Sequence, residues 1–512
     1  MRTHGSAELP RLAWLARVPL AGGGKVEVVH GHAVEIGDGW VVEGVWDDMF
    51  ENGDFHRSEA FFGSGLRVDG DGTVHACAST ALVDGLVYAV DHGSMIISNS
   101  MVVLMAACGG RLAVGHDYRS ECSASLRGLF AQPYALTLEH GAYVSLQRLF
   151  HGNLAFDGRG GWSVHMRTKR RGFESFDSYS RSLRRTLRAI ADNGADTRRR
   201  VPVAAYSTLS TGYDSVAVTC LAHEVGVNAC FTTRPDGSRR GPSSAMEDGT
   251  TIARTIGLQA QILRAPSTSA TTMLEEHFYA PTLWGSELIF SDMAERIAST
   301  DGVAIVYTGY HGDKVWDLHT AQSYLGDDIL RGDTSGLNLS EVRLVAGFFN
   351  VALPFLFARD IGALVQIAGS NEMAPWRIGN EYDRPIPRRI AESAGVPRFA
   401  FGQRKQVAMR NDQLVFNPAL RENFEQWLAT HCGLGRGRLR ASLMLDEVGW
   451  KLGALLDAAR APPSATRWAR AIGDQLRLGR RLGHLRFVWA ANDLADRLAA
   501  AAPELQAPVS RH

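Results

Sequence analysis

The spacing of hydrophobic and polar residues changes about a third of the way along the chain. Between 31 and 161, short apolar runs such as GDGWVVEGVW and HGAYVSLQRLF are separated by Gly, Asp and Asn. This alternation, with turn residues at short intervals, predicts strands joined by hairpins. The stretch 173–193 then places Leu183, Leu187 and Ile190 at helical spacing with arginines on the other faces, which predicts an amphipathic helix.

Patterns typical of strands and helices alternate in the second part of the chain. Buried strands are predicted at 201–209, 228–233, 259–263 and 304–308, and helices at 216–225 and 248–256. Such alternation predicts a parallel sheet with helices on both faces. Ligands bind these sheets beyond the carboxyl ends of the strands, so the loops that follow the predicted strands are the first candidates for a site.

Length and composition limit the fold and the partners. A chain of 512 residues is expected to form about two or three domains. The predicted class is α/β, with a first domain at 1–172, a parallel-sheet domain at 173–411 and a helical C-terminal extension at 412–512. The 54 Lys and Arg residues equal the 54 Asp and Glu residues, and without a cationic excess nucleic-acid binding is not expected as the main task.

The sequence also argues against a membrane or secreted location. The N-terminus lacks the apolar core of a signal peptide. The apolar run 344–358 is about 15 residues long and contains Asn350 and Pro354, whereas a spanning helix needs about 20 apolar residues. We therefore predict a buried core helix there. The six cysteines include no CxxC pair, so reduced thiols in a cytoplasmic protein are expected.

The first candidate loop, STGYDS at 210–215, follows the predicted strand 201–209 directly. Backbone N–H groups, serine hydroxyls and a helix N-terminus in such a loop form a cradle for phosphate. A carboxylate at Asp214 beside phosphates fits a bound Mg²⁺ that bridges to their oxygens. The predicted nucleotide-binding residues of this loop are Ser210, Thr211, Gly212, Asp214 and Ser215. The alternative is that this Ser-, Gly- and Asp-rich segment is only a turn.

The second candidate loop, TGYHGD, follows the strand 304–308 and lies about 100 residues after the first. STGYDS resembles the SGGxDS loop of the ATP-pyrophosphatase superfamily, and TGYHGD resembles the TGYGxD segment of β-lactam synthetases. Asparagine synthetases carry SGEGxDE there, so Tyr310 and Lys314 replace their two glutamates. The resemblance implies ATP and Mg²⁺, with the metal held by Asp214 and Asp313.

The resemblance extends beyond the two loops. SNEMAPW, which contains Glu372, is similar to the family's ExRxPF segment, and the segment at 396–405 is similar to its LP…RxK ending. This places Lys405 where a lysine contacts pyrophosphate and the anionic intermediate. Tyr310 with Glu372 resembles the Tyr–Glu dyad of β-lactam synthetases. The alternatives are that Tyr310 is a packed aromatic residue and that Lys405 is a surface charge. Contacts to adenine and ribose are implied for Ser210, Thr232, Thr308 and Gly309.

The N-terminal half is similar to the class II glutamine amidotransferase domain, in the segment GLVYAVDHGSMIISNSMVVLM. That domain uses a cysteine at position 2 as its nucleophile, but this chain has Arg2, and its first cysteine is Cys77. We therefore expect a degenerate α/β domain of the Ntn type that serves as a scaffold. β-Lactam synthetases and lasso-peptide macrolactam synthetases have lost the same cysteine.

Together these features predict an AMP-forming, ATP-dependent amide ligase. It would adenylate a small-molecule or peptide carboxylate, and a substrate amine would displace AMP to form a lactam or macrolactam. Amidation with free ammonia, or with ammonia from a partner glutaminase, is the first alternative. A catalytically inactive scaffold that binds a peptide or nucleotide is the second. A macrolactam product would imply a precursor peptide and a partner protease.

Overall fold

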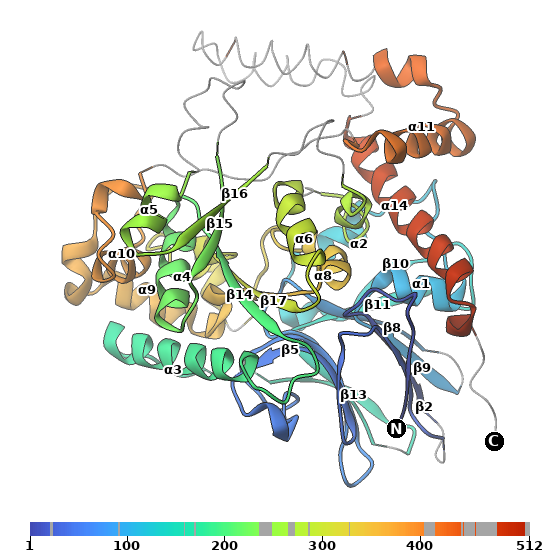
Figure 1. Ribbon diagram of the computed structural model, residues 1–512, viewed down its shortest axis with the longest axis horizontal. Helices are drawn as coiled ribbons and strands as arrows, with labels where there is room; N and C mark the ends of the chain where they lie inside the picture. Colours follow the sequence, from blue (N-terminus) through green and yellow to red (C-terminus); the bar gives the residue numbers. More distant parts are fainter. Residues whose placement is uncertain are drawn as a thin grey trace.

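The computed structural model describes residues 1–20, 24–90, 93–157, 159–167, 170–234, 248–264, 272–284, 287–326, 328–403, 415–441, 444, 456 and 479–506. This part of the chain is mixed α/β, as predicted, and contains three β-sheets, one of which is entirely parallel (Figure 1). Among the described residues, no helix combines the length and the apolar composition that crossing a membrane requires.

The N-terminal part forms two sheets that pack face to face. The first has the order β1 (Arg2–Gly5), β3 (Glu27–His30), β2 (Trp14–Pro19), β9 (Ser94–Ser98), β8 (Gly85–Val90), β11 (Ser145–Phe150) and β10 (Tyr134–Thr137). The second has the order β13 (Trp162–Met166), β12 (Gly152–Phe156), β7 (Val74–Cys77), β6 (Phe61–Val68), β5 (Trp40–Trp46) and β4 (Glu35–Gly37). Alternate residues of both sheets, among them Trp14, Ile97, Leu66 and Leu154, share one buried cluster.

The parallel sheet has the order β16 (Gln259–Leu263), β15 (Ala229–Thr233), β14 (Val203–Thr208), β17 (Val303–Thr308) and β18 (Phe348–Ala352). The chain starts at the centre with β14, moves outward through β15 and β16, and then returns to the other side of β14 with β17. The strand order therefore reverses between β14 and β17. In open parallel sheets this reversal is where ligands bind.

The helices have the following bounds: α1 (Met101–Cys108), α2 (Arg119–Ala124), α3 (Phe176–Gly194), α4 (Tyr213–Glu224), α5 (Thr250–Thr255), α6 (Ser291–Ala298), α7 (Gly312–Val315), α8 (Leu339–Ala346), α9 (Ile361–Gly369), α10 (Pro385–Ser393), α11 (Pro418–Cys432) and α14 (Gly479–Ala501). The predicted helices at 173–193, 216–225 and 248–256 correspond to α3, α4 and α5. α3 begins with a capping box at Ser175 and Ser178, which satisfies its first free N–H groups.

The prediction of one buried helix over 344–358 is wrong. α8 ends at Ala346, where Gly347 adopts a left-handed φ of 86°, and the chain continues as strand β18. The apolar run is buried as predicted, but burial alone does not distinguish a helix from an inner strand. β18 pairs with β17 along its length, from Phe348 opposite Ala304 to Ala352 opposite Thr308, and this pairing decides its conformation.

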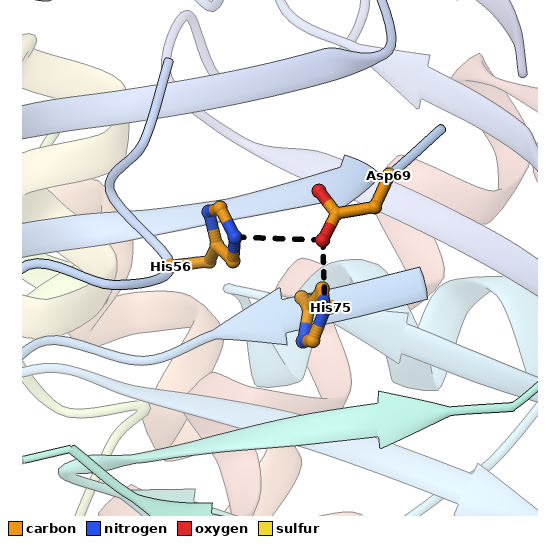
Figure 2. A group of neighbouring side chains, drawn as sticks. All are labelled: His56, Asp69 and His75. Atoms are coloured by element: carbon orange, nitrogen blue, oxygen red, sulfur yellow. Dashed lines mark ion pairs between the residues drawn. The ribbon is translucent and has the colours of Figure 1, made fainter. Parts of the chain in front are cut away.

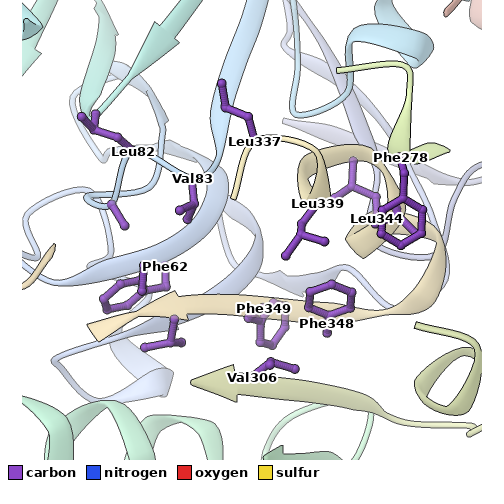
Figure 3. Packing of buried hydrophobic residues seen from close by; sticks show 14 of the residues in the cluster. Phe62, Leu82, Val83, Phe278, Val306, Leu337, Leu339, Leu344, Phe348 and Phe349 are labelled. Carbon is purple, nitrogen blue, oxygen red and sulfur yellow. The ribbon is translucent and has the colours of Figure 1, made fainter. Parts of the chain in front are cut away.

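The N-terminal sheets and the parallel sheet share a continuous hydrophobic core. Figure 3 shows Phe62 and Val83 of the N-terminal part in the same buried cluster as Phe349 and Val306 of the parallel sheet. β18 also contacts β5 and β6 directly. The two halves are therefore joined through buried apolar surface as well as through the chain.

The described part of 412–512 is helical, as predicted. α14 packs against α1 on the N-terminal half and also contacts α11 (Figure 1). Asn492 of α14 accepts the N–H of Leu112 at 2.8 Å and donates to its carbonyl at 2.9 Å. The C-terminal helix thus returns to the N-terminal sheets.

Candidate functional site

The two candidate loops meet at the point where the strand order of the parallel sheet reverses. β14 leads into the first loop and β17 into the second, and these strands are parallel neighbours. A Cβ on Gly312 would lie 2.3 Å from Cγ of Asp214, and a Cβ on Gly309 would lie 2.8 Å from the backbone nitrogen of Ser215. Only glycine at these two positions allows the loops to pack this closely.

Hydrogen bonds within the first loop hold it as a compact turn at the start of α4. The hydroxyls of Ser210 and Ser215 lie 2.7 Å apart, and Ser215 Oγ accepts the N–H of Ser210 at 3.1 Å. Ser210 Oγ accepts the N–H of Gly212 at 3.2 Å. The carbonyl of Thr211 accepts the N–H of Gly402 at 2.8 Å, so the segment that leads toward the predicted RxK ending lies over this loop.

Asp214 stands at the centre of the site with one carboxylate oxygen still unpaired. Its Oδ2 accepts a hydrogen bond from Arg384, which also bridges to Asp317 at 3.2 Å. Its Oδ1 is buried and has no hydrogen-bond partner. Burial raises the pKa of Asp214, Arg384 opposes this shift, and the charge of Asp313 adds to it. An unpaired oxygen beside a second carboxylate suits a bound cation.

Asp313 contributes the second carboxylate. Lys314 Nζ lies 3.0 Å from Asp313 and also donates to Asp333. A positive charge therefore stands where asparagine synthetases carry a glutamate. Asp214 Oδ1 and the carboxylate of Asp313 offer oxygen ligands, the kind that Mg²⁺ prefers.

The carboxylate next to Tyr310 belongs to Glu287. Glu287 is 2% exposed, has a left-handed φ of 46°, and accepts the N–H of Gly336 at 2.7 Å. Burial raises its pKa to about 7. Burial, followed by the charge of Glu287, raises the pKa of Tyr310 well above 10. Glu287 was missed from the sequence; its only signal was an acidic residue within the apolar segment WGSELIF.

Glu372 lies elsewhere, so the expected pairing of Tyr310 with Glu372 is not formed. Glu372 sits in a 3₁₀ turn at Asn371–Trp376, where it accepts a hydrogen bond from Arg389 at 2.8 Å. It also accepts the N–H of Phe176, the first residue of α3, at 3.1 Å. These contacts join three elements around Glu372. Lys405 lies outside the described residues.

Thr232 and Thr308 lie at the carboxyl ends of β15 and β17, the first of them one residue before its strand ends, and both hydroxyls bond within the protein. Thr232 Oγ1 accepts the N–H of Gly249 at 2.8 Å, and Thr308 donates to Oδ1 of Asn350 at 2.8 Å. The two residues are 1% and 3% exposed. A nucleotide would therefore meet the backbone at these strand ends rather than the hydroxyls.

No protein-family model matches the chain, and a search of curated proteins finds no match either. The chemistry of the site must therefore be inferred from its own residues.

Proposed function

We propose that this chain is an AMP-forming, ATP-dependent amide ligase. The observation that carries the proposal is the meeting of two glycine-containing loops at the reversal point of the parallel sheet, where the charge of Asp313 acts on the carboxylate of Asp214. A phosphate cradle and two carboxylates together suit a nucleotide triphosphate with its metal, whereas a carboxylate alone would repel phosphate.

ATP would bind with its phosphates at the first loop. The N–H groups at the start of α4 and the hydroxyls of Ser210 and Ser215 are the available donors. Asp214 and Asp313 would hold Mg²⁺, which when bound neutralises charge on the departing pyrophosphate. Arg384, already beside Asp214, supplies a buried guanidinium that can also face phosphate.

The reaction would proceed in two steps. A carboxylate oxygen of the substrate attacks the α-phosphorus of ATP, and pyrophosphate leaves. The amine then attacks the acyl carbon, and AMP leaves with the bonding electron pair. In this second step the amine passes its proton to the Tyr310 oxygen while Tyr310 passes its own proton to Glu287. Since the pKa of Tyr310 is well above 10 and that of Glu287 is about 7, Glu287 is the base and Tyr310 the relay.

The amine is proposed to come from the substrate itself, which gives a lactam or macrolactam. Five of the six cysteines are buried, and burial raises their pKa, so these thiols are poor nucleophiles for releasing ammonia from glutamine. The substrate would then be a small molecule or peptide that carries both the carboxylate and the amine.

The test is to identify the products formed from ATP and to ask whether their formation requires Asp214 and Asp313. The protein is incubated with Mg²⁺, ATP and a panel of amino acids and short peptides, and AMP, ADP and pyrophosphate are measured. AMP and pyrophosphate are expected from the wild type, with loss in Asp214→Asn and Asp313→Asn and retention in the exposed control Asp117→Asn. ADP and phosphate as products, or near-normal AMP release by either site variant, would exclude the proposed chemistry.

A further inference from the structure

Three metal-ligating side chains converge on the second N-terminal sheet, on elements separate from the ATP loops. Asp69 follows β6, His75 lies on β7, and His56 lies in the loop that precedes β6. Figure 2 shows the two imidazoles facing the same carboxylate oxygen. One ligand atom from each residue can be chosen so that all three lie within 4.8 Å of one another.

The distances match those around one small cation. Asp69 Oδ2 lies 3.6 Å from Nε2 of His56 and 3.4 Å from Nε2 of His75. Two ligand atoms about 2.0–2.1 Å from one zinc ion, at the tetrahedral angle, are about 3.3 Å apart. The same distances are too long for good hydrogen bonds. The three residues are therefore spaced as the ligands of one ion would be.

The buried ring of His56 makes no hydrogen bond. It is 5% exposed, and neither of its ring nitrogens has a hydrogen-bond partner. A buried imidazole left in this state is costly, because it loses its bonds to water without replacing them.

The surroundings orient the carboxylate toward the two histidines. Arg67 Nε donates to Asp69 Oδ1 at 2.9 Å, which leaves Oδ2 for the cluster. Arg67 is itself held by the carbonyls of Asn52 and Gly53 at 2.7 and 2.8 Å. Such bonds from neighbours fix a ligand before the metal arrives. Arg57 approaches Oδ2 at 3.9 Å, but its side chain is 72% exposed and can move away.

We propose that His56, Asp69 and His75 bind a divalent first-row transition metal, with Zn²⁺ the best match. Two imidazoles and one carboxylate suit such ions better than Mg²⁺ or Ca²⁺, which prefer oxygen ligands alone. Water would complete the coordination, since Asp69 and His75 are each 19% exposed in their side chains. The ion would join the His56 loop to the β6–β7 hairpin. This site is independent of the proposed ligase activity.

Cobalt provides a direct spectroscopic test. The full-length protein is stripped with EDTA and titrated with Co²⁺ while the visible absorption of the ion is followed. The wild type is expected to bind one equivalent at this site, and Zn²⁺ should displace it. His75→Asn and Asp69→Asn should weaken binding by more than the roughly 10- to 100-fold typical of changes to outer-shell partners. His140→Asn, an exposed histidine outside the cluster, should bind as the wild type does.

Thermal unfolding separates loss of metal from loss of fold. The wild type and His75→Asn should have similar Tm values without metal, and Zn²⁺ should raise the Tm of the wild type alone, because a ligand stabilises only the state that binds it. Asp69→Asn serves as the second variant if His75→Asn unfolds early. Equal Co²⁺ affinity in the wild type and in both cluster variants, or no binding by the wild type, would overturn the proposal.

Discussion

Burial decides which side chain at the Tyr310 hydroxyl can accept a proton. A phenol that loses contact with water and faces a carboxylate holds its proton more tightly, so Tyr310 stays protonated at pH 7. The same burial raises the pKa of Glu287 to about 7, the range in which a carboxylate works best as a base near neutral pH. The roles proposed for the two residues follow from their shared environment.

Removing the Tyr310 hydroxyl should separate the two chemical steps. Tyr310→Phe is expected to keep pyrophosphate exchange into ATP and to slow amide formation by about 10²- to 10⁴-fold, the usual size of general acid–base assistance. Tyr307→Phe, at a buried tyrosine of β17, is the control and should retain both steps. Loss of exchange in Tyr310→Phe would place the tyrosine in the ATP site instead.

The proposed role of Glu287 as a base predicts that the rate of amide formation depends on pH. A base must be deprotonated, so the rate of amide formation should rise with pH, reach half its maximum at about pH 7, and level off at higher pH. In Glu287→Gln the rate should be lower and this rise should vanish, since no titrating group remains at that position. Rates are measured from pH 5.5 to 8.5 at saturating substrate. The same rise in Glu287→Gln would show that another group is responsible.

At the scale of elements, two turns between strand and helix form the site by packing against each other. The loop after β14 begins α4, and the loop after β17 begins α7, so each loop is held by a strand on one side and a helix on the other. The contact between them requires the absence of a side chain at Gly309 and Gly312. Small changes at this contact should therefore alter nucleotide binding before they alter the fold.

Gly312→Ala tests that contact. The added Cβ would meet Cγ of Asp214 at 2.3 Å, so one loop must shift and the two carboxylates must separate. We expect ATP binding in the presence of Mg²⁺, measured by calorimetry, to weaken at least about tenfold, while the circular dichroism spectrum is unchanged. Gly115→Ala, where a Cβ would meet nothing within 4 Å, is the matched control. Wild-type affinity in Gly312→Ala would show that ATP does not use this contact.

At the scale of the whole molecule, α8 links the two halves through buried charges. Arg343 of α8 donates to Glu43 at 2.6 and 2.9 Å and to Asp84 at 2.6 Å, and all three side chains are at most 1% exposed. Glu341 of the same helix accepts the hydroxyl of Ser100 at 2.6 Å. The N-terminal sheets therefore supply the partners that make a buried arginine on α8 tolerable.

Breaking this network should destabilise the protein as a unit. Arg343→Leu leaves two carboxylates buried without their cation, which costs about 3–5 kcal/mol when a buried pair is broken. Urea unfolding followed by fluorescence and by circular dichroism measures the loss. Arg436→Met removes an exposed pair with Glu422 and should cost about 0–1 kcal/mol. Equal stability of the two variants would mean that water reaches Arg343 in the native state.

The sequence by itself determined the α/β class and four of the five strands of the parallel sheet, β14 to β17. These features follow from local periodicity and turn residues, which each segment carries independently. The placement of STGYDS and TGYHGD after β14 and β17 was predictable for the same reason. The chemistry proposed for the two loops remains a prediction, resting on Asp214 and Asp313.

Only the tertiary structure decided which distant residues meet. Strand pairing with β17 made 348–352 a strand, although the apolar run alone fitted a helix equally well. Glu287 reaches Tyr310, and Arg384 reaches Asp214, across long stretches of chain that no local pattern connects. The cluster around His56 likewise depends on the pairing of two strands and the path of one loop. Contacts of this kind arise from packing between elements, and a single sequence does not record them.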